Sequence, residues 1–122
     1  MASKVKLPRL RVRRTNNWIE VYTERVGPYR YSYVLGLVTK DGALVISDAW
    51  IDEPLRKKGL GKKMVARIVK EAGVETVEVH SVLPEAKGFW ESIGIKEVDE
   101  PGKFRRVSVK RNRFLEGEWF FD

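Results

Sequence analysis

The sequence predicts an α/β fold of the α+β kind, with a mixed, mostly antiparallel central sheet, one parallel strand pair and a crossover helix. Three observations predict it. Alternating segments separated by turn residues fill the first fifty positions, as in antiparallel sheets. An amphipathic helical pattern follows, and it is succeeded by strand, helix and strand patterns. A strand, a helix and a neighbouring strand normally form a right-handed parallel pair.

The first two segments are expected to be strands joined by a turn. Residues 9–14 (RLRVRR) alternate apolar and basic side chains, and residues 15–17 (TNN) are turn formers. A second strand is expected from Trp18 to about Arg25 (WIEVYTER), because the pair Gly27-Pro28 that follows interrupts a strand.

The third and fourth segments are expected to form a hairpin. Residues 31–39 (YSYVLGLVT) are rich in aromatic and β-branched side chains, which favour strands. The turn at residues 40–42 contains the Asp-Gly pair that two-residue hairpin turns prefer. Residues 43–51 (ALVISDAWI) should therefore pair antiparallel with the third strand.

An amphipathic helix is expected to begin within residues 55–64 (LRKKGLGKKM) and to end at Gly73, a natural C-terminal stop. Its apolar residues recur at helical spacing and predict one buried stripe. These residues are Leu60, Met64, Val65, Ile68, Val69 and Ala72.

The C-terminal half is expected to add a strand, a helix and a strand pair. Residues 75–81 (ETVEVHS) alternate cleanly and should lie parallel to residues 43–51. Pro84 suits the first turn of a second helix that ends at Gly94. Residues 95–98 and 104–110 should close the sheet as a strand pair. The apolar face of the second helix holds Ala86, Phe89, Trp90 and Ile93.

Length and composition predict a single domain over residues 1–122, since one core usually serves about 100 to 150 residues. The chain has no cysteine and one histidine, which excludes disulfides, thiolate nucleophiles and the usual zinc sites, so no metal is expected. Its apolar runs are far shorter than the roughly 20 residues that span a bilayer. We therefore expect a cytoplasmic protein.

Charge is concentrated in three segments. With 24 basic and 17 acidic residues the net charge is +7, and residues 1–14, 55–70 and 103–113 contain only basic charges. Such clusters favour an anionic partner, either nucleic acid or a phosphorylated small molecule. The aromatic tail at residues 114–122 predicts a dimer contact.

A phosphate site is expected where the first helix begins. Gly59 and Gly61 leave backbone amides uncovered at the positive end of the helix dipole, and five nearby cations strengthen the attraction for an anion. A Walker loop is excluded because Arg56 occupies the place of its first glycine. The dinucleotide fingerprint is excluded because its third glycine would fall at Met64.

These residues resemble those of the GNAT superfamily of acetyl-CoA-dependent N-acetyltransferases. Residues 56–61 (RKKGLG) match the family signature Q/R-x-x-G-x-G/A and follow a strand and a short acidic-proline turn. The second helix matches the family form A-x-x-(F/L)-Y-x-x-x-G-F at Ala86, Phe89, Trp90, Gly94 and Ile95. The resemblance extends over about residues 30–110.

The resemblance implies acetyl-CoA as cofactor and an amine-bearing acceptor, either a protein or a small molecule. The backbone of Ala49, Trp50 and Ile51 would pair with the pantetheine arm, and amides of Lys57 to Lys62 would bind the pyrophosphate. The amine would attack the thioester directly, in a ternary complex. The residues implied in the cofactor loop are Arg56, Lys57, Lys58, Gly59, Leu60, Gly61 and Lys62.

Three features depart from the family pattern. Trp90 stands where the family usually has a tyrosine that protonates the thiolate, and an indole N–H cannot serve as that acid. Leu83 replaces an asparagine often found three residues before the alanine. Residues 15–30 show no amphipathic helix, although the family normally has two helices between its first two strands. This leaves the acceptor side open or completed by another subunit.

Two residues are candidates for the catalytic base. His80 lies near the end of a predicted strand, and Glu78 shares its face and could orient the imidazole; the alternative is an ordinary half-exposed histidine. Asp48 lies in the cofactor strand, on the alternating face of Ile46 and Trp50. It could have a raised pKa and act as base, or it could pair with a cation.

Two other functions stay open. A nucleic-acid-binding module would explain the dispersed basic charge but not the glycine spacing. A CoA-binding protein without turnover would explain Trp90 at the tyrosine position. Both alternatives imply that acetyl-CoA is not consumed with any amine.

Overall fold

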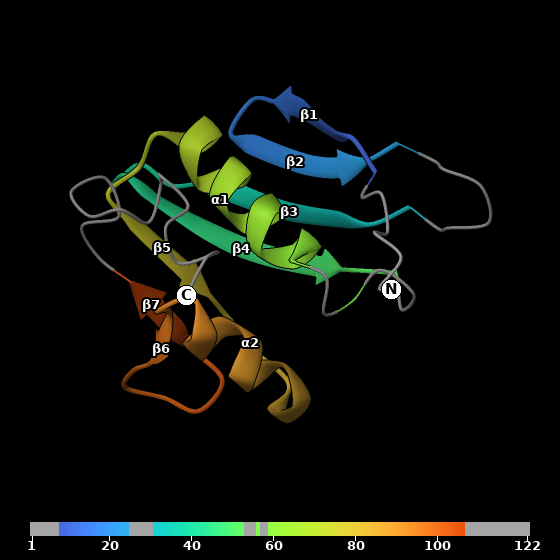
Figure 1. The fold of residues 1–122 in the computed structure, drawn as a ribbon. Coiled ribbons are helices and arrows are strands. Elements are labelled where there is room, and N and C mark those ends of the chain that lie inside the picture. Colours follow the sequence, from blue (N-terminus) through green and yellow to red (C-terminus); the bar gives the residue numbers. More distant parts are fainter. Residues whose placement is uncertain (1–7, 25–30, 53–55, 57–58, 107–122) are drawn as a thin grey trace, which may run out of the picture.

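The computed structural model describes residues 8–24, 31–52, 56 and 59–106, which contain one seven-stranded sheet in the order β1-β2-β3-β4-β5-β7-β6 (Figure 1). The strands are β1 (Leu10–Thr15), β2 (Trp18–Thr23), β3 (Tyr33–Val38), β4 (Ala43–Trp50), β5 (Thr76–Val79), β6 (Lys96–Glu97) and β7 (Phe104–Arg106). The helical elements are α1 (Leu60–Ala72), the 3₁₀ turn η2 (Pro84–Ala86) and α2 (Lys87–Ser92). The predicted fold class is confirmed.

Strands β1 to β4 form an antiparallel meander, and the turns between β1 and β2 and between β3 and β4 are short. The β1–β2 turn places Asn16 at φ 52°, a left-handed conformation that asparagine tolerates. In the β3–β4 turn Gly42 has φ 78°, and the Thr39 amide donates to the Ala43 carbonyl at 2.8 Å. The hairpin predicted from the Asp-Gly pair is therefore confirmed.

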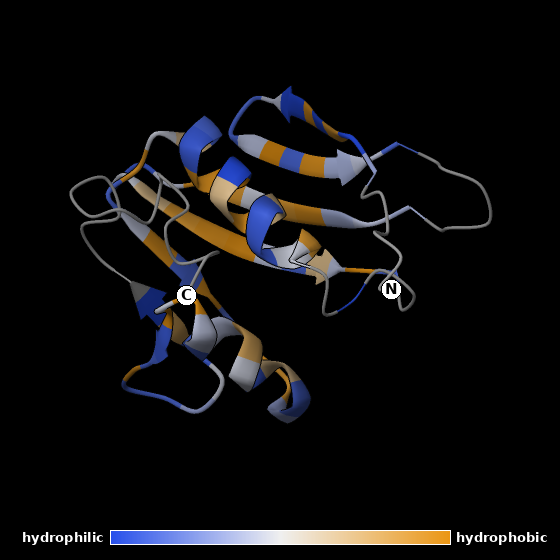
Figure 2. Cartoon of the chain, in the orientation of Figure 1, coloured by the Kyte–Doolittle hydropathy of each residue, from blue (hydrophilic) through white to orange (hydrophobic). Residues whose placement is uncertain are grey.

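Strands β4 and β5 are parallel, as predicted, and α1 connects them. The buried side of α1 carries five of the six predicted stripe residues, and Gly73 ends the helix with φ 63°. Figure 2 shows apolar residues along the strands that α1 crosses. The core beneath α1 is formed by side chains that alternate along β2 to β5, which is why these strands have one buried face. It includes Ile19, Val21, Val34, Leu44, Ile46, Val77 and Val79.

Strand β5 is shorter than the sequence predicts. The strand stops at Val79, and Ser81 has φ 56°, which a strand cannot contain. Beyond it, α2 ends before Gly94 at φ 82° as expected. The predicted closing pair is confirmed by the antiparallel β6 and β7, while residues 107–110 of the predicted strand lie outside the described residues.

A β-bulge interrupts β4 at Ser47. Leu35 pairs with Asp48 while Gly36 pairs with Ile46, so Ser47 is an extra residue in the ladder. Side chains before and after a bulge do not follow simple alternation. Asp48 therefore lies on the face opposite Ile46, and the expectation that the two share a face was wrong. Asp48 does share a face with Trp50, whose β3 partner is Tyr33.

The face of β1 to β4 that points away from α1 is called the open face below. β1 and β2 are joined by a two-residue turn, with no helix between them, so the departure noted in the sequence is confirmed over residues 15–24. Residues 25–30 lie outside the described part of the chain. The same holds for the tail at residues 114–122, and its dimer contact stays a prediction.

Candidate active site

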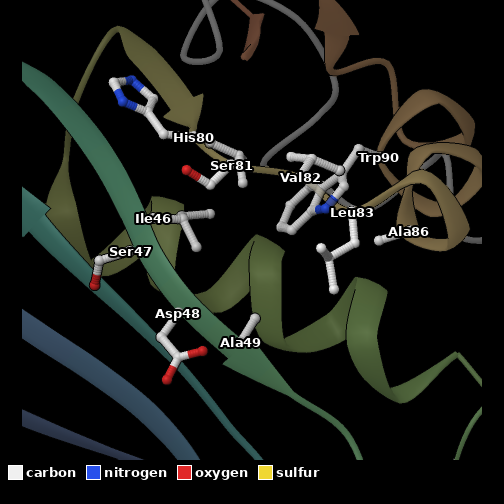
Figure 3. Close-up of a pocket in the computed structure, with 11 residues that line it drawn as sticks. Ile46, Ser47, Asp48, Ala49, His80, Ser81, Val82, Leu83, Ala86 and Trp90 are labelled. Atoms are coloured by element: carbon white, nitrogen blue, oxygen red, sulfur yellow. The ribbon is translucent and has the colours of Figure 1, made fainter. Parts of the chain in front are cut away.

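Strands β4 and β5 separate where the bulge begins. Their parallel pairing runs from Ala43 with Thr76 to Ile46 with Val79 and then ends. A hollow of about 190 Å³ opens between the two strand ends (Figure 3). Its lining residues are Ile46, Ser47, Asp48, Ala49, Val79, His80, Ser81, Val82, Leu83, Ala86 and Trp90. The hollow thus collects Asp48, Ala49 and His80 from the residues that the sequence singled out.

The lining comes from both faces of the sheet. Ile46 and Val79 belong to the core under α1, and Trp90 joins that core from α2. Asp48 belongs to the open face, and His80 lies one residue after Val79. The hollow is therefore apolar toward the helices and polar toward the open face. A reaction between a ligand on the helix side and one on the open face is geometrically feasible here.

The N-terminus of α1 has the features of an anion site. Its cap is Gly59 with φ 83°, no side chain caps the helix, and no acidic residue lies in the first turn. Amides near the start of such a helix lack intrahelical acceptors and attract anions. Leu60 is buried, while Gly61 and Lys62 are partly exposed.

Arg56, which precedes α1, contacts the end of β4. The Nε of Arg56 donates a hydrogen bond to the carbonyl of Ile51 at 2.8 Å. This bond fixes the guanidinium beside the end of β4, between the two predicted cofactor segments. Lys57 and Lys58 lie outside the described residues, so their role in binding an anion stays a prediction.

Gly61 allows α2 to approach the start of α1. A Cβ at Gly61 would lie 3.0 Å from Cε1 of Phe89 and 3.7 Å from Cγ1 of Ile51. The first distance is tighter than an ordinary contact and the second is not, so the absent side chain makes room for the aromatic ring of Phe89. The second signature glycine therefore has a packing role in addition to any role at the helix terminus.

His80 and Glu78 lie together, as the alternation of β5 predicts. The Nε2 of His80 is 3.1 Å from Oε2 of Glu78, and Nε of Arg105 is 2.7 Å from Oε1 of the same carboxylate. Burial raises the pKa of Glu78, but hydrogen bonds from His80 and Arg105 and the charges of Arg105 and Lys103 outweigh it and leave the pKa below its ordinary value. The His80 side chain is 48% exposed, which fits the alternative of an ordinary half-exposed histidine. It also lines the hollow.

Asp48 accepts a hydrogen bond from Tyr33. The phenol oxygen lies 2.6 Å from Oδ2 of Asp48. This bond raises the pKa of Tyr33 to about 12, with a further contribution from partial burial. Tyr33 is therefore a neutral donor at physiological pH. The partner of Asp48 is a tyrosine and not the cation named in one of the two alternatives from the sequence.

Three features of the site were not expected from the sequence. Ser47 is the bulge residue, and its Oγ donates to the Leu35 carbonyl at 3.3 Å. Ser81 brings a hydroxyl to the hollow in a left-handed conformation. Tyr33, on the neighbouring strand β3, orients Asp48 through its hydrogen bond. Only Tyr33 left a signal in the sequence, since its alternation with Tyr31 predicts that the two rings share a face.

Trp90 and Leu83, the two side chains that depart from the family pattern, both line the hollow. Trp90 is 5% exposed and packs edge-on against Phe89, with ring centroids 5.0 Å apart. Leu83 is 61% exposed. Both add apolar surface to the helix side of the hollow.

The described residues contain no group of three or more His, Cys, Asp or Glu side chains placed to bind a metal ion. Within that same part of the chain, the helices are too short or too polar to span a bilayer.

Comparison with known proteins identifies the fold. No family model matches the sequence, and no curated protein matches it either. Solved structures do match. A GNAT-family acetyltransferase from Staphylococcus aureus Mu50 superposes with a TM-score of 0.64 at 11% identity, over 75% of this chain and 68% of the other. The chain therefore has the GNAT acetyltransferase fold, which confirms the resemblance at the level of structure.

Two further structures support this assignment. Tetrahymena GCN5 matches with a TM-score of 0.60 at 9% identity, over 77% of this chain and 70% of the other. AtaTR, solved with bound AcCoA, matches with a TM-score of 0.58 at 16% identity, over 77% and 69%. At these identities the likeness establishes the fold.

Proposed function

We propose that the protein is an N-acyltransferase that moves an acetyl group from acetyl-CoA to a primary amine. The observation that carries this proposal is the hollow between β4 and β5, lined by Asp48 and Ala49 of the strand that precedes α1 and its uncapped N-terminus. The bound AcCoA of the structural neighbour AtaTR supports the choice of ligand.

The chain offers complementary groups for each part of acetyl-CoA. Beyond Ile46 the edge of β4 is no longer paired with β5, and an extended ligand can add to such an edge as a strand does. Ala49 to Ile51 would supply these backbone groups. The pyrophosphate would bind the amides at the start of α1, and Lys62 and Arg56 would contribute positive charge.

The transfer needs one base on the open side. The bound thioester supplies an activated acetyl carbonyl; a C–N bond forms to the amine, the C–S bond breaks, and the amine loses a proton. Asp48 or His80 would accept that proton, because both line the hollow. Trp90 cannot protonate the leaving thiolate. With an ordinary thiol pKa of about 8.5, the thiolate can leave and take its proton from water.

The first experiment is calorimetric titration of the full chain with acetyl-CoA and CoA. We expect micromolar binding, weakened at least about tenfold by Lys62→Glu, which places a negative charge in the first turn. Because an acidic residue in the first turn interacts favourably with the helix dipole, this variant should be at least as stable as the wild type. Lys70→Glu is the matched control, since it makes the same charge change in the last turn, about 12 Å along the axis.

The result decides between the proposal and its alternatives. Binding that is equally weakened by both variants would show a general charge effect and no site at α1. No binding by the folded wild type would contradict the proposal and favour the nucleic-acid alternative. Binding without loss of acetyl-CoA across a screen of amines would indicate the non-catalytic alternative, which Trp90 at the tyrosine position favours.

A further inference from the structure

The open face carries aromatic side chains in register across three strands. Tyr22 on β2 pairs with Tyr33 on β3, which pairs with Trp50 on β4. Directly paired residues of neighbouring strands project on the same face. Tyr31 adds a fourth ring, with its centroid 5.5 Å from that of Tyr22 and 5.7 Å from that of Tyr33. The four rings are called the aromatic row.

Charged side chains of the open face lie in the row next to the aromatic row. Arg13, Glu20, Leu35 and Asp48 are successive partners across β1 to β4. Arg13 and Glu20 form an ion pair at 2.9 Å. Asp48 has no cation partner among the described residues, and Tyr33 donates its hydrogen bond without neutralising the charge. One uncompensated carboxylate therefore lies beside the aromatic row and lines the hollow.

The aromatic row already binds a cation within the chain. The guanidinium carbon of Arg13 lies 4.4 Å from the centroid of the Tyr22 ring, and Nη2 of Arg13 donates to the Tyr31 hydroxyl at 2.9 Å. Aromatic faces attract cations through their quadrupole, and several rings with a carboxylate form the usual environment for organic ammonium groups. Arg13 occupies the β1 end, whereas the end at Asp48 has no such occupant among the described residues.

We propose that Tyr33 and Trp50, at one end of the aromatic row, form with the adjacent Asp48 a binding site for an organic ammonium group of the acceptor. This inference rests on the proposed function, because it identifies where that reaction's amine substrate binds. The ammonium contacts the carboxylate of Asp48 at the mouth of the hollow while the aromatic rings contact its methylene groups. Tyr33 is a positioning residue, since its hydroxyl fixes the carboxylate.

The source of the ammonium is either a polypeptide lysine or a free alkylamine. The two-residue β1–β2 turn adds no element over this face, and Asp48 is exposed, so within the described part of the chain a lysine on a protein can approach as a small amine does. The shared chemistry defines the site. Separate experimental probes distinguish the sources.

The test uses calorimetric titration of the full chain with choline and with its neutral isostere 3,3-dimethylbutanol. We expect choline to bind and the alcohol to bind at least about fivefold more weakly, since only choline carries a charge. Asp48→Asn should weaken choline binding about tenfold, in line with the loss of a charged partner. Asp41→Asn is the matched control, because it removes the same charge from an exposed turn where asparagine is equally accepted.

Equal binding of choline and the alcohol, or unchanged choline binding in a folded Asp48→Asn variant, would overturn the proposal. A parallel titration of the wild type with acetyl-CoA separates the two claims: acetyl-CoA binding without choline binding refutes this site and leaves the transferase proposal standing. Two amine probes then identify the source. Tighter binding of an N-blocked lysine peptide than of butylamine supports a polypeptide acceptor, and the reverse supports a free amine.

Discussion

Deleting Ser47 should remove the β-bulge and close the hollow while leaving the sheet intact. Ile46 pairs with Gly36 and Asp48 pairs with Leu35, so the residues on either side would keep their faces in a regular strand. The bulge bends β4 at the point where its pairing with β5 stops. Without it, Asp48 can continue the parallel ladder opposite His80. The left-handed Ser81 prevents further extension.

The size of the effect follows from this geometry. One additional residue pair contributes one or two hydrogen bonds, or about 1 kcal/mol of stability. For a domain of this size this corresponds to a rise in Tm of about 2–8 °C. Acetyl-CoA binding should weaken at least about tenfold, because the open edge of β4 would be occupied.

Thermal unfolding followed by circular dichroism and calorimetric titration with acetyl-CoA together measure both effects. Ser47→Ala is the control, because it keeps the extra residue and loses only the hydroxyl that donates to Leu35. A deletion variant that folds and binds acetyl-CoA as tightly as the wild type would refute the link between the bulge and the site. If the deletion variant does not fold, the predicted extension of the β4–β5 ladder beyond Ile46 is wrong.

Three further variants test other parts of the structure. Gly36→Ala should lower the free energy of unfolding by about 1–3 kcal/mol, because its Cβ would lie 2.7 Å from Cδ1 of Leu44 in the core; unchanged denaturant unfolding would argue against this packing. Folding lowers the pKa of Glu78, so the folded state binds fewer protons in acid than the unfolded state. Stability should therefore fall as the pH drops through the folded-state pKa. Glu78→Gln should flatten this pH dependence in thermal unfolding. Trp90→Phe should lower the free energy of unfolding by about 1–2 kcal/mol. It should leave kcat within about twofold, since the indole does not protonate the leaving thiolate. A large loss of kcat at unchanged KM would give Trp90 a direct role in catalysis.

Features set by neighbouring residues could be predicted from the sequence. The Asp41-Gly42 turn and the helix ends at Gly73 and Gly94 depend on local backbone preferences, and the structure has them where expected. The proximity of Glu78 and His80 follows from the two-residue period of a strand. These signals need no knowledge of the partner strands.

Features set by strand pairing could not be predicted. The bulge at Ser47 is defined by the register between β3 and β4, and the pairing of β4 with β5 ends at the residue before it. A bulge shifts alternation by one residue, so the predicted face of Asp48 was wrong relative to Ile46. The bond between Tyr33 and Asp48 depends on the same register. The end of β5 at Val79, two residues before the left-handed Ser81, likewise reflects tertiary packing that overrides a strand-like sequence.

The two-residue turn between β1 and β2 also bears on how this scaffold can change. Asn16 and its neighbours are exposed, and they lie at the outer edge of the sheet. The entropic cost of closing a loop rises only slowly with its length, and exposed loop tips accept inserted segments. An insertion here would add a wall over the open face without disturbing the pairing of β3, β4 and β5. Access to the open face and the integrity of the sheet are therefore separable properties, and an insertion at this turn can vary the first without the second.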